Sequence, residues 1–344
     1  MRHFEEGTTM SDELLDLEEL SEYYKKTNLL LKDLENSQKI KIPSEIYHYT
    51  SLQAIYSILK QKTIRLTNCE FLNDNSEIIY IRKIISELLD TDEDINNYRS
   101  DSNFVSFFKE SVLKTFDKHV EKLTPNIFIL SLTESNHSLS MWSGYSDSDG
   151  YRLTFDFESI VNNIASIGTN TFVSEKKSGS LKLKNFTYTA KVIYSKKDQI
   201  EYLKKFLLIY AKVLFDLGSV RFDSQKATEF NAESISEIFG KLFAFAYICK
   251  DDCFEYENEH RITITFDYRT GDRKLVEQYR FSRGSIIPYI ELDFTDPKTN
   301  LIPIVEIQIG PKINIDIAEK GLKRFLDSSG YSNISVTKSK IPLR

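Results

Sequence analysis

The stretch from Phe254 to Phe266 constrains this chain most, because acidic residues and then an arginine recur in it at every second position. It begins polar and continues as alternating β-forming residues, a pattern that predicts a strand. Side chains two positions apart share one face of a strand. We therefore expect a single charged face, made by Glu255, Glu257, Glu259 and Arg261.

Such a row of charges has two interpretations. Closely spaced carboxylates raise one another's proton affinity, and a guanidinium beside them favours the ionised form. Carboxyl groups perturbed in this way are typical of functional sites. A solvated charged face on an edge strand is the alternative, and it is the common reason for a Glu-x-Glu sequence.

The composition is typical of a globular protein in a reducing compartment. Of the 344 residues, 41% are hydrophobic and 28% are charged. The net charge of −6 provides no general attraction for nucleic acid, which would need a local basic patch. The cysteines, Cys69, Cys249 and Cys253, are too few for a disulfide framework. No apolar run approaches the ~20 residues that cross a bilayer, and the N-terminus lacks an apolar signal region, so we expect a cytoplasmic protein without membrane contact.

The motifs of common nucleotide, zinc-protease and serine-hydrolase sites do not occur in the sequence. Cys249 and Cys253 with His260 offer three potential zinc ligands at one irregular spacing, unlike the usual paired-cysteine sites. We therefore predict no metal site.

Strands and helices occur without a regular β-α-β order, and the strands alternate in polarity. This pattern predicts an α+β fold with partly antiparallel sheets. Residues 1–40 are predicted to form a helical extension, which could pack on the body of the protein or on a partner protein. Residues 41–344 contain no Pro-, Gly- or Ser-rich linker and are predicted to form a single domain.

His48 lies where a predicted strand meets the start of a helix, in the sequence Tyr47-His48-Tyr49-Thr50. A helix start offers free N–H groups and a partial positive charge, which suit a phosphate or an amide. Histidine and threonine side chains at this point can hydrogen-bond a ribose hydroxyl. A capped turn with a half-buried histidine is the alternative, and these residues alone do not separate the two.

Three short motifs together resemble the signature positions of ADP-ribosyltransferases. They are His48-Tyr49-Thr50 on a first strand, Ser131-x-Thr133 on a middle strand and Glu257-x-Glu259 on a late strand. The resemblance implies an ADP-ribosyltransferase-like fold of split antiparallel β-sheets flanked by helices, with NAD as the substrate. In that superfamily the first motif orients NAD, the Ser/Thr strand supports the site, and the late glutamate binds the nicotinamide ribose.

The resemblance implies a catalytic role for the two glutamates. Glu259 would stabilise the positive charge that develops on the ribose as the glycosidic bond breaks, and Glu257 would polarise the acceptor. The remaining candidates would bind NAD: the first two motifs its nicotinamide and ribose, the aromatic residues its ring, and the arginines its pyrophosphate. This cofactor-binding set is His48, Tyr49, Thr50, Arg65, Ser131, Thr133, Trp142, Tyr145 and Arg261, and Arg280 and Arg283 are further phosphate candidates.

A closer resemblance, over about residues 44–344, is to a bacterial family called domain-of-unknown-function family 2971. Its markers are matched by His48-Tyr49-Thr50, Leu72-Asn73-Asp74-x-x-Glu77, Ser140-Met141-Trp142-x-x-Tyr145, Glu257-x-Glu259-x-Arg261 and Ser339-Lys340-Ile341-Pro342-x-Arg344. The family name carries no activity, so the chemistry is predicted from the transferase-like pattern.

That pattern implies an NAD-dependent ADP-ribosyltransferase that modifies a macromolecule, either nucleic acid or protein. Bacterial proteins of this type often belong to toxin or phage-defence systems. Two alternatives stay open: an NAD glycohydrolase or other hydrolase that uses the same carboxylates, and a non-enzymatic binding module in which the charged strand is an interaction face.

Overall fold

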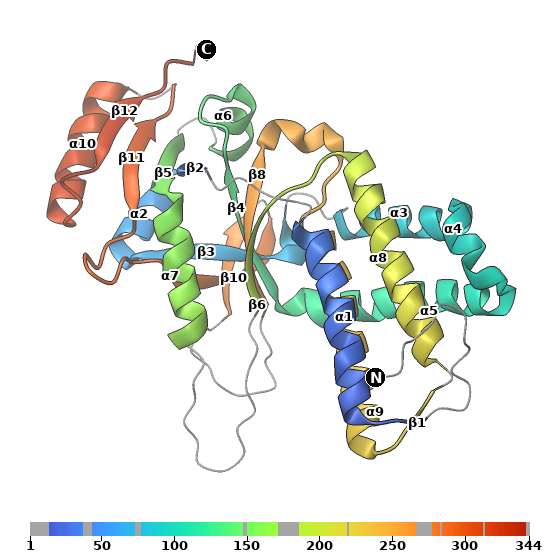
Figure 1. Ribbon diagram of the computed structural model, residues 1–344. Coiled ribbons are helices and arrows are strands. Elements are labelled where there is room, and N and C mark those ends of the chain that lie inside the picture. Colours follow the sequence, from blue (N-terminus) through green and yellow to red (C-terminus); the bar gives the residue numbers. More distant parts are fainter. Residues whose placement is uncertain are drawn as a thin grey trace. The chain divides into compact units, whose positions relative to one another are not determined.

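The computed structural model describes residues 14–36, 43–72, 77–146, 150–170, 186–218, 220–265, 277–282, 284–311 and 314–341. Contacts divide the chain into two compact units, each built from segments that are distant in sequence (Figure 1). Unit 1 consists of residues 1–39, 76–121 and 193–252, and unit 2 of residues 40–75, 122–192 and 253–344. The predicted division into residues 1–40 and 41–344 stays a prediction, because a compact group of contacts does not test independent folding.

Unit 1 is built from helices that pack through apolar and aromatic side chains. Helix α1 contacts α8 and α9, and Tyr202 stacks on Phe245 with ring centroids 3.7 Å apart. The predicted N-terminal helix therefore belongs to this helical unit. Its elements are α1 (Leu17–Asn36), α3 (Glu77–Thr91), α4 (Glu93–Asn96), α5 (Ser102–Leu123), α8 (Lys196–Leu217) and α9 (Gln225–Ala246), with the short strands β1 (Leu14–Leu15) and β7 (Arg221–Phe222).

Helix α9 begins within a polar stretch of the sequence. The polar segment 218–233 is typical of a loop, but the helix already starts at Gln225. Ser224 is extended, and its hydroxyl accepts a hydrogen bond from the Ala227 N–H at 3.2 Å. A serine N-cap satisfies one of the free N–H groups at a helix start, and here it outweighs the polar character of the segment.

Unit 2 carries a large sheet. Its main path runs β12 (Ser335–Lys338), β11 (Ile304–Ile309), β5 (Gly150–Asp156), β2 (Glu45–Ser51), β4 (Ile127–Thr133), β3 (Thr63–Asn68), β10 (Ser285–Asp293) and β9 (Gln278–Ser282). Strand β8 (Glu259–Thr265) pairs with β4 and with β6 (Phe186–Lys191). The pairings are antiparallel except for the parallel pair β11–β12. The predicted α+β class with antiparallel sheets flanked by helices is confirmed.

The sheet forks at β4. One edge of β4 pairs with β8 along its whole length, from Ile127 to Thr133. The other edge pairs with β3 at Phe128 and Ile129, and with β2 at Thr133. Strands β2 and β3 therefore share one edge of β4 and diverge around Ser131.

The two faces of this sheet differ in character. One face carries the main apolar core, which includes Ile46, Leu130, Leu153 and Ile262 and is covered by α2 (Leu52–Gln61), α7 (Phe157–Asn170) and α10 (Ile315–Ser328) (Figure 1). Phe128, Leu130 and Leu132, which alternate along β4, all join this core. The other face carries polar residues and a small apolar cluster with α6 (Leu139–Tyr145), made of Tyr47, Tyr49, Met141, Trp142, Ile341 and Tyr145.

The predicted strand 254–266 is wrong in its first part. Asp252–Glu257 forms a 3-10 helix, and β8 begins only at Glu259. Between them Asn258 has a φ of 43°, a left-handed conformation that asparagine adopts more readily than most residues. This turn breaks the period of two, so Glu255 and Glu257 do not continue the strand face of Glu259 and Arg261.

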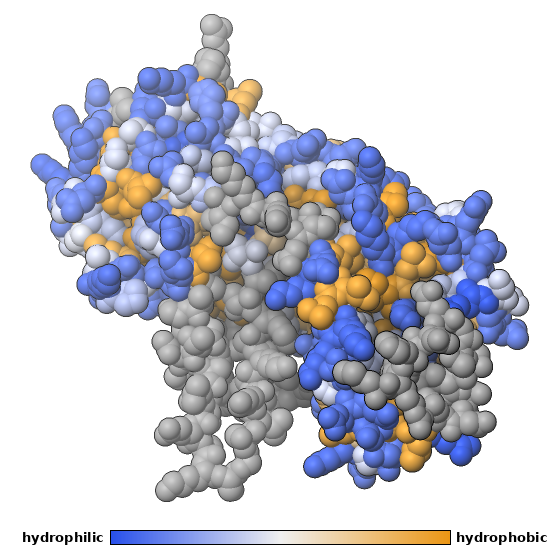
Figure 2. All heavy atoms as spheres, in the orientation of Figure 1, coloured by the Kyte–Doolittle hydropathy of each residue, from blue (hydrophilic) through white to orange (hydrophobic). Residues whose placement is uncertain are grey.

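The surface in view is mostly hydrophilic, with apolar groups between the polar ones (Figure 2). Within the described part of the chain, no helix has the length and apolar character that crossing a membrane requires. The same residues contain no group of three or more potential metal ligands.

Candidate functional site

A row of polar side chains crosses the face of unit 2 opposite its main core. The strand registers pair Glu306 with Thr154, Thr154 with Tyr47, Tyr47 with Thr133, and Thr133 with Glu259. Residues directly opposite each other in antiparallel strands lie on the same face. The row therefore joins β11, β5, β2, β4 and β8, and it brings two of the predicted motifs side by side.

Glu259 and Arg261 form a buried ion pair at the β8 end of this row. Arg261 donates from Nε to Glu259 Oε1 at 2.9 Å and from Nη2 to Oε2 at 3.0 Å. The exposed fractions of the two residues are only 4% and 1%. Planar, bidentate pairing is the geometry for which arginine is suited. A guanidinium bonded to both oxygens of a carboxylate favours the ionised form of that carboxylate.

Glu257 lies close to this pair but is held differently. Its side chain is buried, and its Oε1 accepts a hydrogen bond from the Tyr145 hydroxyl. Its backbone carbonyl accepts one from Thr133 Oγ1. Thr133 thus bonds the turn that carries Glu257 and lies in register with Glu259. The two residues with the predicted catalytic carboxylates are therefore both neighbours of Thr133, although they do not share a strand face.

His48 lies in the fork of the sheet. Its Nδ1 is 3.3 Å from the Ser131 carbonyl, at the point where β2 and β3 diverge along β4. Burial lowers the pKa of this half-buried histidine, and the bond to the Ser131 carbonyl only partly opposes that effect. His48 is therefore neutral at pH 7. The structure brings the first and second predicted motifs into contact through this pair.

The other residues of the first motif, Tyr49 and Thr50, make contacts within the fold. Tyr49 is buried, and its hydroxyl donates to the Ser135 carbonyl at 2.9 Å. Thr50 is half-buried and in register with Tyr151. Ser51 caps α2 by accepting a hydrogen bond from the Ala54 N–H, which confirms the predicted helix start.

Trp142 is buried beside Tyr49. The two rings meet edge to face with centroids 4.9 Å apart, and Trp142 is 2% exposed. Its indole N–H has no hydrogen-bond partner in the described structure. A buried donor without a partner is uncommon in proteins and calls for an explanation.

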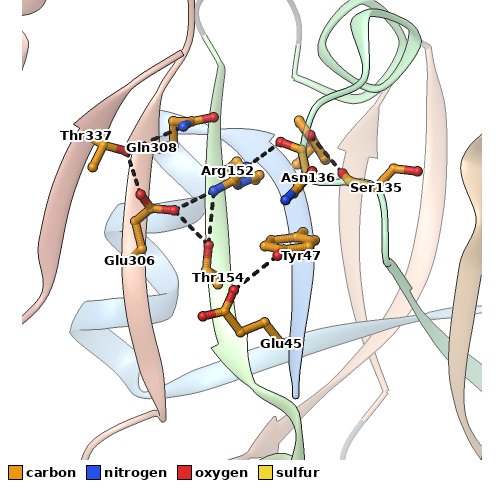
Figure 3. Close-up of polar contacts among 10 residues, drawn as sticks. Glu45, Tyr47, Ser135, Asn136, Arg152, Thr154, Glu306, Gln308 and Thr337 are labelled. Atoms are coloured by element: carbon orange, nitrogen blue, oxygen red, sulfur yellow. Dashed lines mark hydrogen bonds and ion pairs between the residues drawn. The ribbon is translucent and has the colours of Figure 1, made fainter. Parts of the chain in front are cut away.

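Sequence reasoning missed Arg152, which lies at the centre of the polar row (Figure 3). Arg152 is 5% exposed, and its guanidinium lies over the Tyr47 ring, 4.6 Å from the centroid. It donates to the Glu306 carboxylate and, from Nη2, to Thr154 Oγ1 at 3.3 Å. Its Nε has no partner among the described residues.

Further bonds hold this arginine network in place. The Thr337 hydroxyl donates to Glu306 Oε1 at 2.7 Å, and the Tyr47 hydroxyl donates to Glu45 Oε2 at 3.1 Å. Arg152 also donates to the Asn136 carbonyl (Figure 3). An arginine inside the alternating strand Gly150–Asp156 is a signal for such a network, but its glutamate partner is too distant in sequence to be found by pattern.

A second missed group lies at the end of β4. The Glu134 carboxylate accepts hydrogen bonds from His260 Nε2 and from Lys191 Nζ, the latter at 3.0 Å. Burial opposes ionisation of Glu134, but these two bonds outweigh it and lower the pKa of the carboxyl. His260 is 1% exposed, and burial lowers its pKa although Glu134 opposes the shift. His260 faces away from Glu259 and Arg261, as the strand period predicts.

Arg65 lies on the other arm of the fork. Its Nε is 3.1 Å from Glu291 Oε1, on the neighbouring strand β10. The predicted NAD-binding set therefore separates into three groups. His48 and Thr50 are in register with Leu153 and Tyr151 of the main core, and Arg65 lies on the β3–β10 arm. The others lie on the face of the polar row: Tyr49, Ser131, Thr133, Trp142, Tyr145 and Arg261.

These observations define an α+β protein whose forked sheet carries a buried polar row. Residues 141–262 match the model of a family described as "Protein of unknown function (DUF2971)", which confirms the family predicted from the sequence motifs. The matched segment contains Trp142, Tyr145, Arg152, Glu257, Glu259 and Arg261. No curated protein and no solved structure matches the chain. Parts of two predicted family motifs, residues 73–76 and 342–344, lie outside the described residues.

Proposed function

We propose that this chain is an NAD-dependent ADP-ribosyltransferase that modifies a nucleic acid or a protein. The observation that carries the proposal is the meeting of three motif positions, distant in sequence, on the adjacent strands β2, β4 and β8. His48 contacts the Ser131 carbonyl, and Thr133 is in register with Glu259. The order of these strands along the chain and their adjacency in the sheet both agree with the transferase-like pattern.

The groups around the row suit the chemistry of NAD. The indole N–H of Trp142 and Nε of Arg152 are buried donors without partners in the described structure, and NAD offers carboxamide, hydroxyl and phosphate oxygens as acceptors. His48 is not one of these groups, because it is in register with Leu153 of the main core and its side chain therefore lies on the other face of the sheet. Glu259 and Arg261 are already paired, so their charges are preorganised electrostatically.

Within this proposal the two glutamates have distinct tasks. Glu259, kept ionised by Arg261, stabilises the positive charge that develops on the ribose when the bond to nicotinamide breaks. Glu257, held by the Tyr145 hydroxyl, polarises the acceptor. The arrangement needs no metal, and all the charged groups it uses belong to unit 2.

The test is incubation of the purified chain with NAD carrying a label on its adenosine, in the presence of protein and nucleic acid. Transfer predicts label on a macromolecule, hydrolysis predicts free labelled ADP-ribose, and a binding module yields neither product. The variants Glu257→Gln and Glu259→Gln should each lower product formation at least ~10²-fold, by analogy with other preorganised electrostatic groups.

A matched control is Glu319→Gln. Glu319 lies on α10 and pairs with Lys323 at 2.6 Å on the exposed surface, so its loss should leave product formation unchanged. The proposal would be overturned if Glu257→Gln and Glu259→Gln consumed NAD at the wild-type rate. It would also be overturned if well-folded wild-type protein consumed no NAD with any macromolecule tested.

A further inference from the structure

Two arginines on the β3–β10–β9 arm of unit 2 approach one tyrosine from opposite directions. Arg65 lies on β3 and Arg280 on β9, on either side of β10. The Arg65 guanidinium lies over the Tyr289 ring, 4.5 Å from its centroid. Arg280 donates from Nη2 to Thr67 Oγ1 at 3.3 Å, and Thr67 is in register with Tyr289. Both guanidinium groups therefore converge on Tyr289.

The charges of this group do not cancel. Arg65 pairs with Glu291, at 3.1 Å between Nε and Oε1. The hydrogen bond that Arg280 makes in the described structure goes to an uncharged hydroxyl. Burial lowers the pKa of Arg280, and the positive charge of Arg65 lowers it further. Two guanidinium groups and one carboxylate leave an excess positive charge, which an anion placed between the arginines would neutralise.

The donors are also accessible. The Arg65 side chain is 39% exposed, and both Arg280 and Thr67 are half-buried. Forked guanidinium donors match the oxygen atoms of a phosphate, and a hydroxyl can add a further bond. We propose that Arg65, Arg280 and the Thr67 hydroxyl form a binding site for a phosphate group.

Two sources can supply that phosphate: a free nucleotide, or the backbone of a single-stranded nucleic acid. Tyr279 and Phe281, which flank Arg280 in the terminal strand β9, are 60% and 86% exposed and lie on the opposite face of that strand. Exposed aromatic rings stack on bases in proteins that bind single strands, and a nucleic acid that passes round this edge of the sheet reaches both faces. The proposal does not rest on NAD chemistry, because it uses none of the residues of the polar row.

The experiment is calorimetric titration of the full chain with inorganic pyrophosphate. Wild-type protein should bind saturably, and Arg280→Gln and Arg65→Gln should each weaken binding at least 10-fold. Arg82→Gln is the matched control, because Arg82 lies on α3 and its Nε and Nη2 already donate to the Asp117 carboxylate, at 2.6 and 2.8 Å. Its binding should equal that of the wild type. Measurements without NAD keep this test separate from that of the proposed function.

Thermal unfolding of the same samples separates binding from a structural role. Removing one of two repelling charges should leave the melting temperature of Arg280→Gln, without ligand, equal to or above that of the wild type. If Arg280→Gln fails to fold, Arg280→Lys carries the test. It keeps the charge but loses the fork, and should bind pyrophosphate several-fold more weakly than the wild type.

Two further titrations identify the source. If the protein binds ADP, and Tyr279→Ala and Phe281→Ala bind it with unchanged affinity, the phosphate is that of a nucleotide. Stronger binding of a short single-stranded oligonucleotide, weakened by both aromatic variants and by added salt, identifies a nucleic acid backbone. Absence of binding for pyrophosphate, ADP and oligonucleotide in folded wild-type protein would overturn the proposal, as would wild-type affinity in Arg280→Gln.

Discussion

Glu259 and Arg261 lie two residues apart on β8, and their side chains form a bidentate ion pair that is almost completely buried. A buried pair of charges is costly to desolvate, but removing one partner is costlier, because the other is then left uncompensated. Removing one member of the pair is therefore expected to affect the fold as well as the proposed chemistry. Experiments on variants at these positions must therefore measure stability as well as activity.

The first prediction concerns the stability of this pair. Glu259→Gln should lower the free energy of unfolding by about 3 kcal/mol, because Arg261 would keep its charge in a buried position. Denaturation by urea, followed by circular dichroism, measures the change. In the double variant Glu259→Leu with Arg261→Met, both charges are gone and most of that loss should be recovered. A single variant as stable as the wild type would contradict the buried pair.

The second prediction concerns Arg152 and Glu306. Glu306→Leu should destabilise the protein by about 2 kcal/mol, less than for a fully buried pair because the Glu306 side chain is 24% exposed. Arg152→Met should cost a similar amount. A double-mutant cycle in chemical denaturation should show a coupling free energy above ~0.5 kcal/mol. Additive effects of the two substitutions would mean that the pair in Figure 3 contributes nothing.

The third prediction is a loss of stability in mild acid. His48 and His260 both have pKa values lowered by burial, so near pH 6 the folded protein binds fewer protons than the unfolded chain. The contribution of these histidines to stability is then fully present above the ordinary histidine pKa of about 6.5. It is lost as the pH drops through their pKa values in the folded protein. Melting temperatures measured between pH 7 and pH 5 should fall accordingly.

His48→Asn should make this pH dependence shallower. The asparagine amide can still donate to the Ser131 carbonyl, but it does not titrate in this range. His137→Asn is the control, because His137 is exposed, and it should reproduce the wild-type slope. An identical slope in His48→Asn and the wild type would show that His48 does not contribute.

The fourth prediction uses the fluorescence of Trp142, the single tryptophan of the chain. If NAD binds along the polar row, titration into the millimolar range of typical substrate affinities should change its emission saturably. Trp142→Ala should also cost about 3–5 kcal/mol of stability, because the ring is buried in a packed cluster. Unchanged emission in a folded sample would count against NAD binding at this row.

Local patterns in the sequence predicted the elements that depend on neighbouring residues. Alternation in β4 places Leu130 and Leu132 on one face, which is the core face in the structure, and the period of β8 placed Glu259 and Arg261 on one face and His260 on the other. Such patterns are reliable because the geometry of a strand relates residues only two positions apart. The same rule failed at Glu257, because the left-handed conformation of Asn258 interrupts the strand.

Only the tertiary structure decided which strands became neighbours. Nothing in the alternation of β5 or β11 shows that Arg152 pairs with Glu306, or that Tyr47 lies between Thr154 and Thr133. Those contacts depend on strand order and register, which are determined by packing of the whole apolar face against α2, α7 and α10. The residue types of the candidate site can therefore be seen in the sequence, while its arrangement around Thr133 results from how distant strands share one core.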